Sequence, residues 1–166
     1  MKGMFLLFFT FVVATIISAD DFVEKLAEML SLTQEDVQKC IEKTGTTQDD
    51  IMHFDQIVTD NLQTVDFDEK AKRLGCFFSC LGQKMGIMTD GHLNVDKMKQ
   101  IIRSKVKNPE KLAVGYRILD ICNDQVRSKT NECEISIRFL LCMADETERL
   151  RKNDMQRRYE DNNDNE

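Results

Sequence analysis

The chain has 166 residues, and its 29 acidic residues outnumber its 23 lysines and arginines, which gives a formal charge of −6. Hydrophobic residues make up 42% of the sequence and charged residues 31%, a mixture too apolar for a disordered chain and too polar for a multi-span membrane protein. The acidic balance argues against nucleic acid as the main partner, because phosphate binding requires a basic face. One proline and seven glycines predict a mostly helical chain, and the length predicts one domain.

The first segment has the features of a secretory signal peptide. Lys2 supplies a positive charge, residues 4–17 form an apolar run, and Ser18-Ala19 precede two aspartates. The run is shorter than the roughly 20 apolar residues that a membrane-spanning helix needs. We therefore predict a cleaved signal peptide at 1–19, a secreted extracellular product and no membrane insertion. The alternatives are an N-terminal anchor or a buried helix.

Apolar residues recur at helical spacing along the rest of the chain. Start signals are the capping-box-like Thr33-x-x-Asp36 and Thr47-x-x-Asp50, the cap residue Asn94, and Asn108-Pro109. Together these signals predict an all-α fold, a compact bundle of about six helices within a domain at 20–148. The expected helices lie at 21–30, 34–43, 67–84 and 132–148, with further ones opening at 47, 94 and 108.

Two connecting regions and the C-terminal end do not follow this helical pattern. Residues 85–91 are expected to form an apolar loop punctuated by glycines, and 59–66 a polar loop. The end of the chain, 149–166, is rich in charges and is predicted to be a disordered polar tail.

The six cysteines all follow the predicted signal peptide, so in a secreted protein they predict three disulfides. Six cysteines allow 15 pairings. Cys76 and Cys80 lie one turn apart on one helix face, so each more readily reaches another segment than its neighbour. A zinc site is the rival interpretation, but Cys76-x3-Cys80 is not the usual knuckle and only His53 and His92 are available as further ligands.

No catalytic signature is present: the sequence contains no Gly-x-Ser-x-Gly, no His-Glu-x-x-His and no phosphate-binding loop. With every cysteine paired, no thiol would remain to act as a nucleophile. The sequence therefore predicts that the protein is not an enzyme and needs no cofactor or metal. Histidine is the residue type that most often acts as a pH switch, so the rarity of His53 and His92 raises the hypothesis of pH-gated release, against the simpler interpretation of exposed histidines without a role.

Methionines and phenylalanines are frequent among the apolar positions. Flexible thioethers and aromatic rings suit an adaptable apolar cavity, although an ordinary core explains them as well. The residues in question are Met52, Met85, Met88, Met98, Met143, Phe54, Phe77, Phe78 and Phe139.

The cysteine spacing helps to decide between an apolar cavity and an ordinary core. It is Cys40-x35-Cys76-x3-Cys80-x41-Cys122-x10-Cys133-x8-Cys142, and it resembles that of the six-cysteine insect odorant-binding and pheromone-binding proteins. The x3 and x8 gaps match that family, and CIEKTGTTQDDI and MGIMTDGHLNVDKM resemble its sequences. The Cys40–Cys76 gap is longer than usual, which predicts an insertion at 54–67. The hydrophilic end of the chain is too polar to enter a pocket at acid pH, as the C-terminus does in some relatives.

The resemblance implies pairs Cys40–Cys80, Cys76–Cys133 and Cys122–Cys142, and a helical bundle around an apolar pocket that carries small hydrophobic odorants or pheromones. Small hydrophobic molecules are thus the expected partners, with a membrane receptor or a homodimer as further options. Tyr116, Thr89 and Ser79 are candidates for orienting a ligand. The predicted ligand-binding residues are Ile51, Phe54, Val58, Met85, Ile87, Met88, Met98, Ile102, Tyr116, Phe139 and Met143.

Two other functional classes compete with the carrier. A secreted signalling or protein-interaction module would use its surface and have no ligand cavity, and the long charged tail favours it. A saposin-like lipid-disrupting protein also combines six cysteines with helices, but its usual Cys-x2-Cys start is absent.

Overall fold

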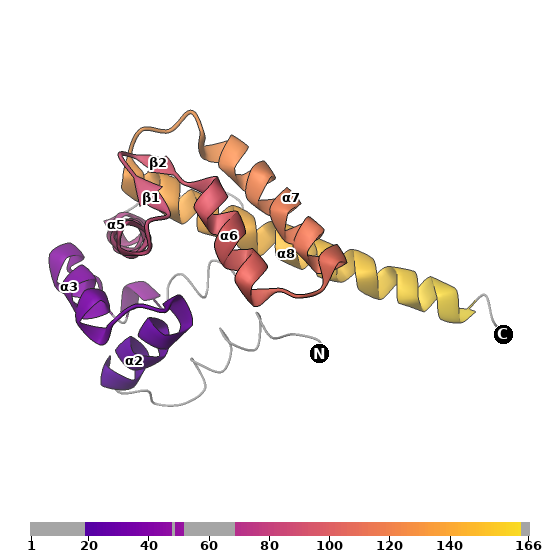
Figure 1. The fold of residues 1–166 in the computed structure, drawn as a ribbon, viewed down its shortest axis with the longest axis horizontal. Helices are drawn as coiled ribbons and strands as arrows, with labels where there is room; N and C mark the ends of the chain where they lie inside the picture. The colour runs from indigo at the N-terminus through magenta and orange to yellow at the C-terminus, as the bar shows by residue number, and fades with distance from the viewer. Residues whose placement is uncertain (1–18, 48, 52–68, 164–166) are drawn as a thin grey trace.

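The computed structural model describes residues 19–47, 49–51 and 69–163, and in these residues the chain folds into helices and one short hairpin (Figure 1). The all-α prediction is therefore confirmed. The elements are α2 (Ala19–Leu30), α3 (Gln34–Thr44), α5 (Glu69–Met85), β1 (Met88–Thr89), β2 (His92–Leu93), α6 (Val95–Lys105), α7 (Pro109–Val126) and α8 (Glu132–Asn163), with a further helical turn at 49–51.

Local side chains start the helices where the sequence predicts. Thr33 Oγ1 accepts a hydrogen bond from the backbone N–H of Asp36 at 3.1 Å, before α3. Asn94 and Asn108 cap α6 and α7 in the same way, each at 3.0 Å, and Pro109 occupies the first turn of α7. These bonds satisfy N–H groups that have no partner inside the helix.

The hairpin replaces part of the loop expected at 85–91. Met88 pairs with Leu93 and Thr89 with His92, in antiparallel register. Asp90 and Gly91 link the strands with φ angles of 50° and 77°. Two successive residues with positive φ form the tight turn that matches strand twist, which explains why a loop predicted from composition closes into a ribbon.

Helices α5 and α8 form the centre of the fold. α3 packs on α5 and α2 packs on α3, while α7 runs along α8 and α6 along α7 (Figure 1). Gly75 permits the close approach of α5 to α8, because a Cβ there would overlap the backbone carbonyl of Cys133. The fold thus has an N-terminal side and a C-terminal side joined by the α5–α8 pair.

Three disulfides reinforce this arrangement, in the pairs that the family resemblance implies. Cys40–Cys80 joins α3 to α5, Cys76–Cys133 joins α5 to α8, and Cys122–Cys142 joins α7 to α8. Cys76 and Cys80 on α5 therefore reach two different helices, which fixes α5 between α3 and α8.

The buried side chains form two separate groups. One, which we call the N-terminal cluster, lies between α2, α3, α5 and α8; the other, the C-terminal cluster, lies between β1, α6, α7 and α8. The N-terminal cluster comprises Val23, Ala27, Val37, Cys40, Leu74, Phe77, Cys80, Leu81 and Ile137. The C-terminal cluster comprises Met88, Met98, Ile118, Leu119, Cys122, Val126, Ile135, Phe139 and Cys142.

Helix α8 continues to Asn163, past residue 148, where the predicted domain ends and the predicted polar tail begins. The segment contains no glycine or proline. Glu148 accepts hydrogen bonds from Arg151, and Arg149 donates to Glu146, each pair one turn apart. Such i,i+3 pairs support a helix whose composition alone resembles that of a disordered segment. Among the described residues, no helix is both long and apolar enough to cross a membrane.

Candidate functional site

Most of the described residues that the sequence predicts for ligand binding lie at the C-terminal cluster. Met88, Met98 and Phe139 are buried within it, and Ile87, Ile102 and Met143 pack against its edge while remaining partly exposed. They come from four parts of the chain: the turn after α5, strand β1, helix α6 and helix α8. The fold therefore brings six predicted residues together from positions that are distant in sequence.

The other five predicted residues do not belong to this group. Ile51 packs against the N-terminal cluster. Met85 and Tyr116 are half-buried and belong to neither cluster. Phe54 and Val58 lie outside the described residues, as do Met52 and His53. The role of all eleven residues in ligand binding stays a prediction.

Two of the three candidate orienting groups, Tyr116 and Ser79, have protein partners in the structure. The Tyr116 hydroxyl donates to the backbone carbonyl oxygen of Lys99 at 3.3 Å, which connects α7 to α6. Lys99 lies over the Tyr116 ring, 5.7 Å from its centroid, and pairs with Asp120 at 2.6 Å. Ser79 is buried and donates to Glu132 at 3.3 Å, whereas Thr89 is exposed. Tyr116 and Ser79 thus serve interhelical contacts.

A buried ion pair holds the segment after α3 to α5. Asp50 is 1% exposed, and its carboxylate accepts from Arg73 Nη2 at 2.7 Å and Arg73 Nε at 3.0 Å. The same carboxylate accepts from the backbone N–H of Thr47 at 2.9 Å. The hydrogen bonds from Arg73 lower the pKa of Asp50 from 3.8 to about 2, despite the opposing effect of burial. This pair places Ile51 on the N-terminal cluster.

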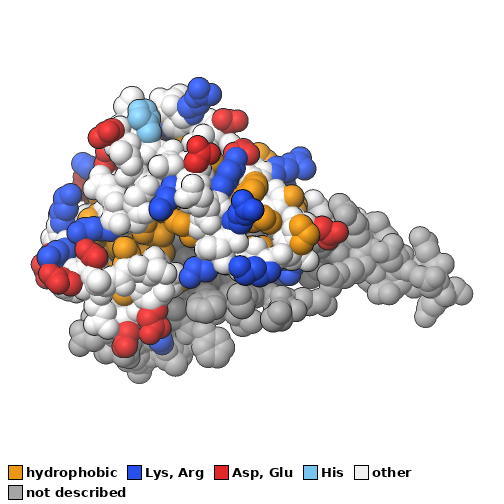
Figure 2. Space-filling view, viewed as in Figure 1, with side chains coloured by type: hydrophobic (Ala, Val, Ile, Leu, Met, Phe, Trp, Pro, Cys, Tyr) orange, Lys and Arg blue, Asp and Glu red, His pale blue; other side chains and the backbone are white. Residues whose placement is uncertain are grey.

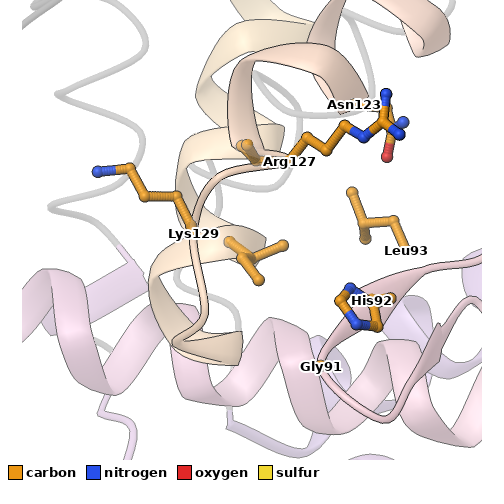
Figure 3. Close-up of a pocket in the computed structure, with 8 residues that line it drawn as sticks. Gly91, His92, Leu93, Asn123, Arg127 and Lys129 are labelled. Carbon is orange, nitrogen blue, oxygen red and sulfur yellow. The ribbon is translucent and has the colours of Figure 1, made fainter.

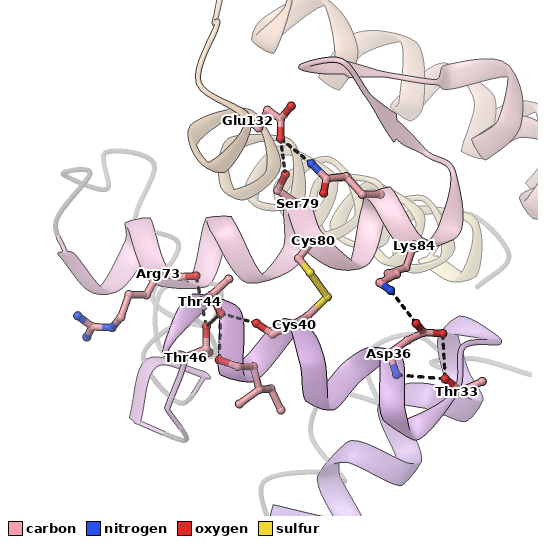
Figure 4. Close-up of a disulfide and its surroundings, with 12 residues drawn as sticks. Thr33, Asp36, Cys40, Thr44, Thr46, Arg73, Ser79, Cys80, Lys84 and Glu132 are labelled. Carbon is pink, nitrogen blue, oxygen red and sulfur yellow. Dashed lines mark hydrogen bonds and ion pairs between the residues drawn. A yellow bond between two sulfur atoms is a disulfide. The ribbon is translucent and has the colours of Figure 1, made fainter.

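Further contacts secure the α3–α5 interface on either side of the Cys40–Cys80 disulfide (Figure 4). Lys84 pairs with Asp36 at 2.9 Å, and at the other end the Thr46 hydroxyl donates to the backbone carbonyl oxygen of Arg73 at 3.3 Å. The interface is thus attached at several points along α5. The polar groups named here are therefore committed to contacts between α3 and α5.

A small surface pocket lies at the edge of the C-terminal cluster (Figure 3). Its volume is about 190 Å³, less than the roughly 300–1,000 Å³ typical of pockets that hold a small molecule. It contains none of the eleven predicted residues. The pocket is lined by Gly91, His92, Leu93, Asn123, Val126, Arg127, Lys129 and Ile135.

Figure 2 shows a second kind of surface, where apolar side chains are visible in the hollow between the α3–α5 side and α6. The partly buried residues at the cluster edges, such as Ile87 and Ile102, are exposed enough to contribute to apolar surface that the described residues do not cover. Among those residues no cysteine is free, and no three His, Cys, Asp or Glu side chains are placed to hold a metal ion.

Comparison with known proteins identifies the fold family. Residues 20–146, which span all six cysteines and both clusters, match the PBP/GOBP family. The chain belongs to the PBP/GOBP family. This confirms the resemblance drawn from the cysteine spacing, and it fits the three helix-linking disulfides and the all-α architecture.

Comparison with individual curated proteins agrees with the family assignment. The chain is 23% identical over 119 residues to the pheromone-binding protein Gp-9 of Solenopsis geminata, covering 70% of this chain and 76% of the relative. It is 22% identical over 145 residues to the pheromone-binding protein Gp-9 of Solenopsis daguerrei, covering 86% of this chain and 91% of the relative. The PBP/GOBP family is a family of binding proteins rather than enzymes.

Proposed function

We propose that this PBP/GOBP family member is a secreted carrier of small hydrophobic, pheromone-like molecules, which bind in an apolar pocket walled by the C-terminal cluster. One observation carries the proposal: predicted ligand-binding residues from separate parts of the chain lie together at that cluster. Met88, Met98 and Phe139 are buried in it, and the partly exposed Ile102 and Met143 pack against it. The relatives named pheromone-binding protein support the same class of ligand.

The chemistry of these walls suits ligands that differ in shape. Three of the six clustered residues are methionines, whose flexible thioether chains adapt to irregular surfaces. Binding would come from removing ligand apolar surface from water, which contributes about 25 cal/mol per Å² before the costs of association. The six clustered residues are all apolar, so selectivity would follow ligand size and shape more than charge.

The disulfide frame explains how such a fold can keep unfilled space. Each bridge closes a loop of 20 to 57 residues, and a loop of that size stabilises a fold by about 3–4 kcal/mol in the chain-entropy model. The stability of the bundle therefore depends less on complete packing of its centre. Disulfides of this number also fit an oxidising extracellular compartment, which agrees with the predicted signal peptide at 1–19.

Native mass spectrometry of the mature protein tests the proposal. After incubation with dodecanol or dodecanoic acid and removal of excess ligand, we expect a one-to-one complex. Phe139→Ala should weaken the complex, whereas Phe77→Ala, in the other cluster, should leave it unchanged in the folded fraction. Absence of any complex with a broad panel of apolar volatiles and fatty acids would favour the protein-interaction module instead.

A further inference from the structure

A charged residue lies on the face of α8 that packs against the C-terminal cluster. Ile135, Phe139 and Cys142 belong to the cluster, and Leu150 packs against it. Side chains three or four residues apart lie on the same face of a helix. Glu146 comes four residues after Cys142 and four before Leu150, so it lies between them on this otherwise apolar face.

The burial of Glu146 agrees with this position. Only 9% of the residue is exposed. Its side chain is 12% exposed, half the value for the side chain of Glu148, which is 24% exposed. Carboxylates are rarely buried to this extent unless a donor binds them. Glu146 is therefore a polar group set into an apolar wall.

The protein supplies a hydrogen bond to one of the two carboxylate oxygens of Glu146. Arg149 Nη2 donates to Oε2 at 2.6 Å, and Oε1 accepts no hydrogen bond from the described residues. Among those residues, no fully enclosed side-chain oxygen or nitrogen lacks a partner, so Oε1 keeps an opening through which a donor can approach. The ion pair with Arg149 thus holds the carboxylate in place and leaves one oxygen available.

Asp50, the other acidic residue that is buried among the described residues, is bound differently. Its Oδ1 atom accepts from Arg73, and its Oδ2 atom accepts from both Arg73 and Thr47. Both oxygens of Asp50 are therefore bound by protein donors, as expected of a carboxylate with a structural role. Glu146 differs because one of its acceptor positions can bind a donor from outside the protein.

The candidate orienting groups do not fill this role. Tyr116 and Ser79 donate their hydroxyl protons to protein oxygens, and Thr89 is exposed. Met143, a wall residue of the proposed pocket, precedes Glu146 by one helical turn. Residues spaced in this way have Cβ atoms about 5–6 Å apart, so a ligand against Met143 would have its polar end near the Glu146 carboxylate.

We propose that Glu146 determines specificity for long-chain alcohols, by accepting the ligand O–H at Oε1 while the hydrocarbon chain lies against the C-terminal cluster. An ether of the same size has no proton to donate, and its oxygen is repelled by the carboxylate. Because hydrogen bonds to charged groups are stronger than those between neutral groups, the alcohol should bind about tenfold more tightly than the ether. The inference rests on the carrier function proposed above.

Isothermal titration calorimetry of the disulfide-bonded protein tests this preference with dodecanol and its isomer methyl undecyl ether. The two ligands have the same atoms and similar apolar surface, and differ in the ability to donate a hydrogen bond. We expect the wild-type protein to bind dodecanol about tenfold more tightly. Equal affinities would overturn the role of Glu146 but leave the carrier function intact, whereas binding of neither ligand would contradict both.

Variants then assign the preference to this side chain. Glu146→Met keeps the length of the side chain on an apolar face and should bind both isomers equally. Glu146→Gln, which retains a neutral acceptor oxygen, should show an intermediate preference and provides the test if the methionine variant does not fold. Glu148→Met removes the neighbouring glutamate, which pairs with Arg151, and should keep the full preference. Full preference in either Glu146 variant, or its loss in Glu148→Met, would overturn the assignment.

Discussion

The two apolar clusters share α8 but differ in how they are built. In the N-terminal cluster Leu74, Phe77 and Leu81 are at most 2% exposed, and a disulfide and a buried ion pair adjoin them. In the C-terminal cluster Met88, Met98 and Phe139 are 3–8% exposed, and partly exposed apolar side chains continue the surface. Each cluster contains a disulfide and is bordered by partly buried apolar side chains, but among the described residues only the N-terminal cluster adjoins the Asp50–Arg73 ion pair and only the C-terminal cluster contains methionines.

This difference indicates a division of roles. Closely packed, well-ordered side chains contribute most to the free energy of unfolding, because any cavity there removes many contacts. Flexible thioethers lose less when a neighbouring group moves, which suits a surface that must accommodate a guest. We expect changes in the N-terminal cluster to affect mainly stability, and changes in the C-terminal cluster to affect mainly ligand affinity.

The largest effect is expected at the centre of the N-terminal cluster. Phe77→Ala should lower the free energy of unfolding by about 3–5 kcal/mol, because a fully buried ring is replaced by a cavity. Urea denaturation followed by circular dichroism measures this value. A loss below 1 kcal/mol would mean that this side is as loosely packed as we infer the other to be.

Removing single disulfides compares the two sides directly. The Cys40→Ala, Cys80→Ala double variant opens a loop of 40 residues and should cost about 4 kcal/mol; the Cys122→Ala, Cys142→Ala variant opens one of 20 and should cost about 3 kcal/mol. Thermal denaturation of both variants gives the ranking. The reverse order would show that the C-terminal side, and not the N-terminal side, depends more on its cross-link.

The Asp50–Arg73 pair should make the N-terminal side sensitive to acid. The folded-state pKa of Asp50 is about 2 and its ordinary value 3.8, so the stabilisation is complete above pH 3.8 and is lost as the pH falls through 2. The amount lost is about 2 kcal/mol.

Urea titrations between pH 5 and pH 2 measure this loss, and Asp50→Asn should remove it from the pH profile. The control is Asp36→Asn, since the Asp36–Lys84 pair is more exposed and screened by solvent. An unchanged profile in Asp50→Asn would show that the pair does not depress the Asp50 pKa.

The smallest expected effect is the loss of ligand-binding free energy in Phe139→Ala. Loss of the ring from the pocket wall should weaken binding of an apolar fluorescent naphthylamine probe about tenfold, which corresponds to about 1.4 kcal/mol. The helical signal in circular dichroism should be largely retained. Unchanged displacement of the probe by dodecanol would remove Phe139 from the binding site and weaken the contrast between the two clusters.

The sequence predicts the local features of this fold well. Helix starts at Thr33, Asn94 and Asn108 depend on side chains within three residues of the backbone groups that they bind. The family resemblance could be drawn from the sequence because the spacing of the cysteines reflects which helices the disulfides join. Apolar periodicity also indicated which segments form helices.

Periodicity does not show which buried faces meet. Ile51 has the same apolar character as Ile102, yet the two lie at different clusters. The Asp50–Arg73 pair joins residues 23 positions apart, and only the local Thr47–Asp50 contact had a signature in the sequence. Composition likewise carries no information about the i,i+3 spacing that pairs Glu148 with Arg151 at the boundary between the predicted domain and the predicted tail.

The central claim is that a ligand lies against the C-terminal cluster, and methionine methyl NMR tests it most directly. In protein labelled with ¹³C at methionine methyl groups, titration with dodecanol should shift the signals of Met88, Met98 and Met143 at one-to-one saturation. Met29, 40% exposed on α2, serves as the internal reference and should not move. Shifts confined to Met29, or no saturable shift at the three cluster methionines, would contradict the account.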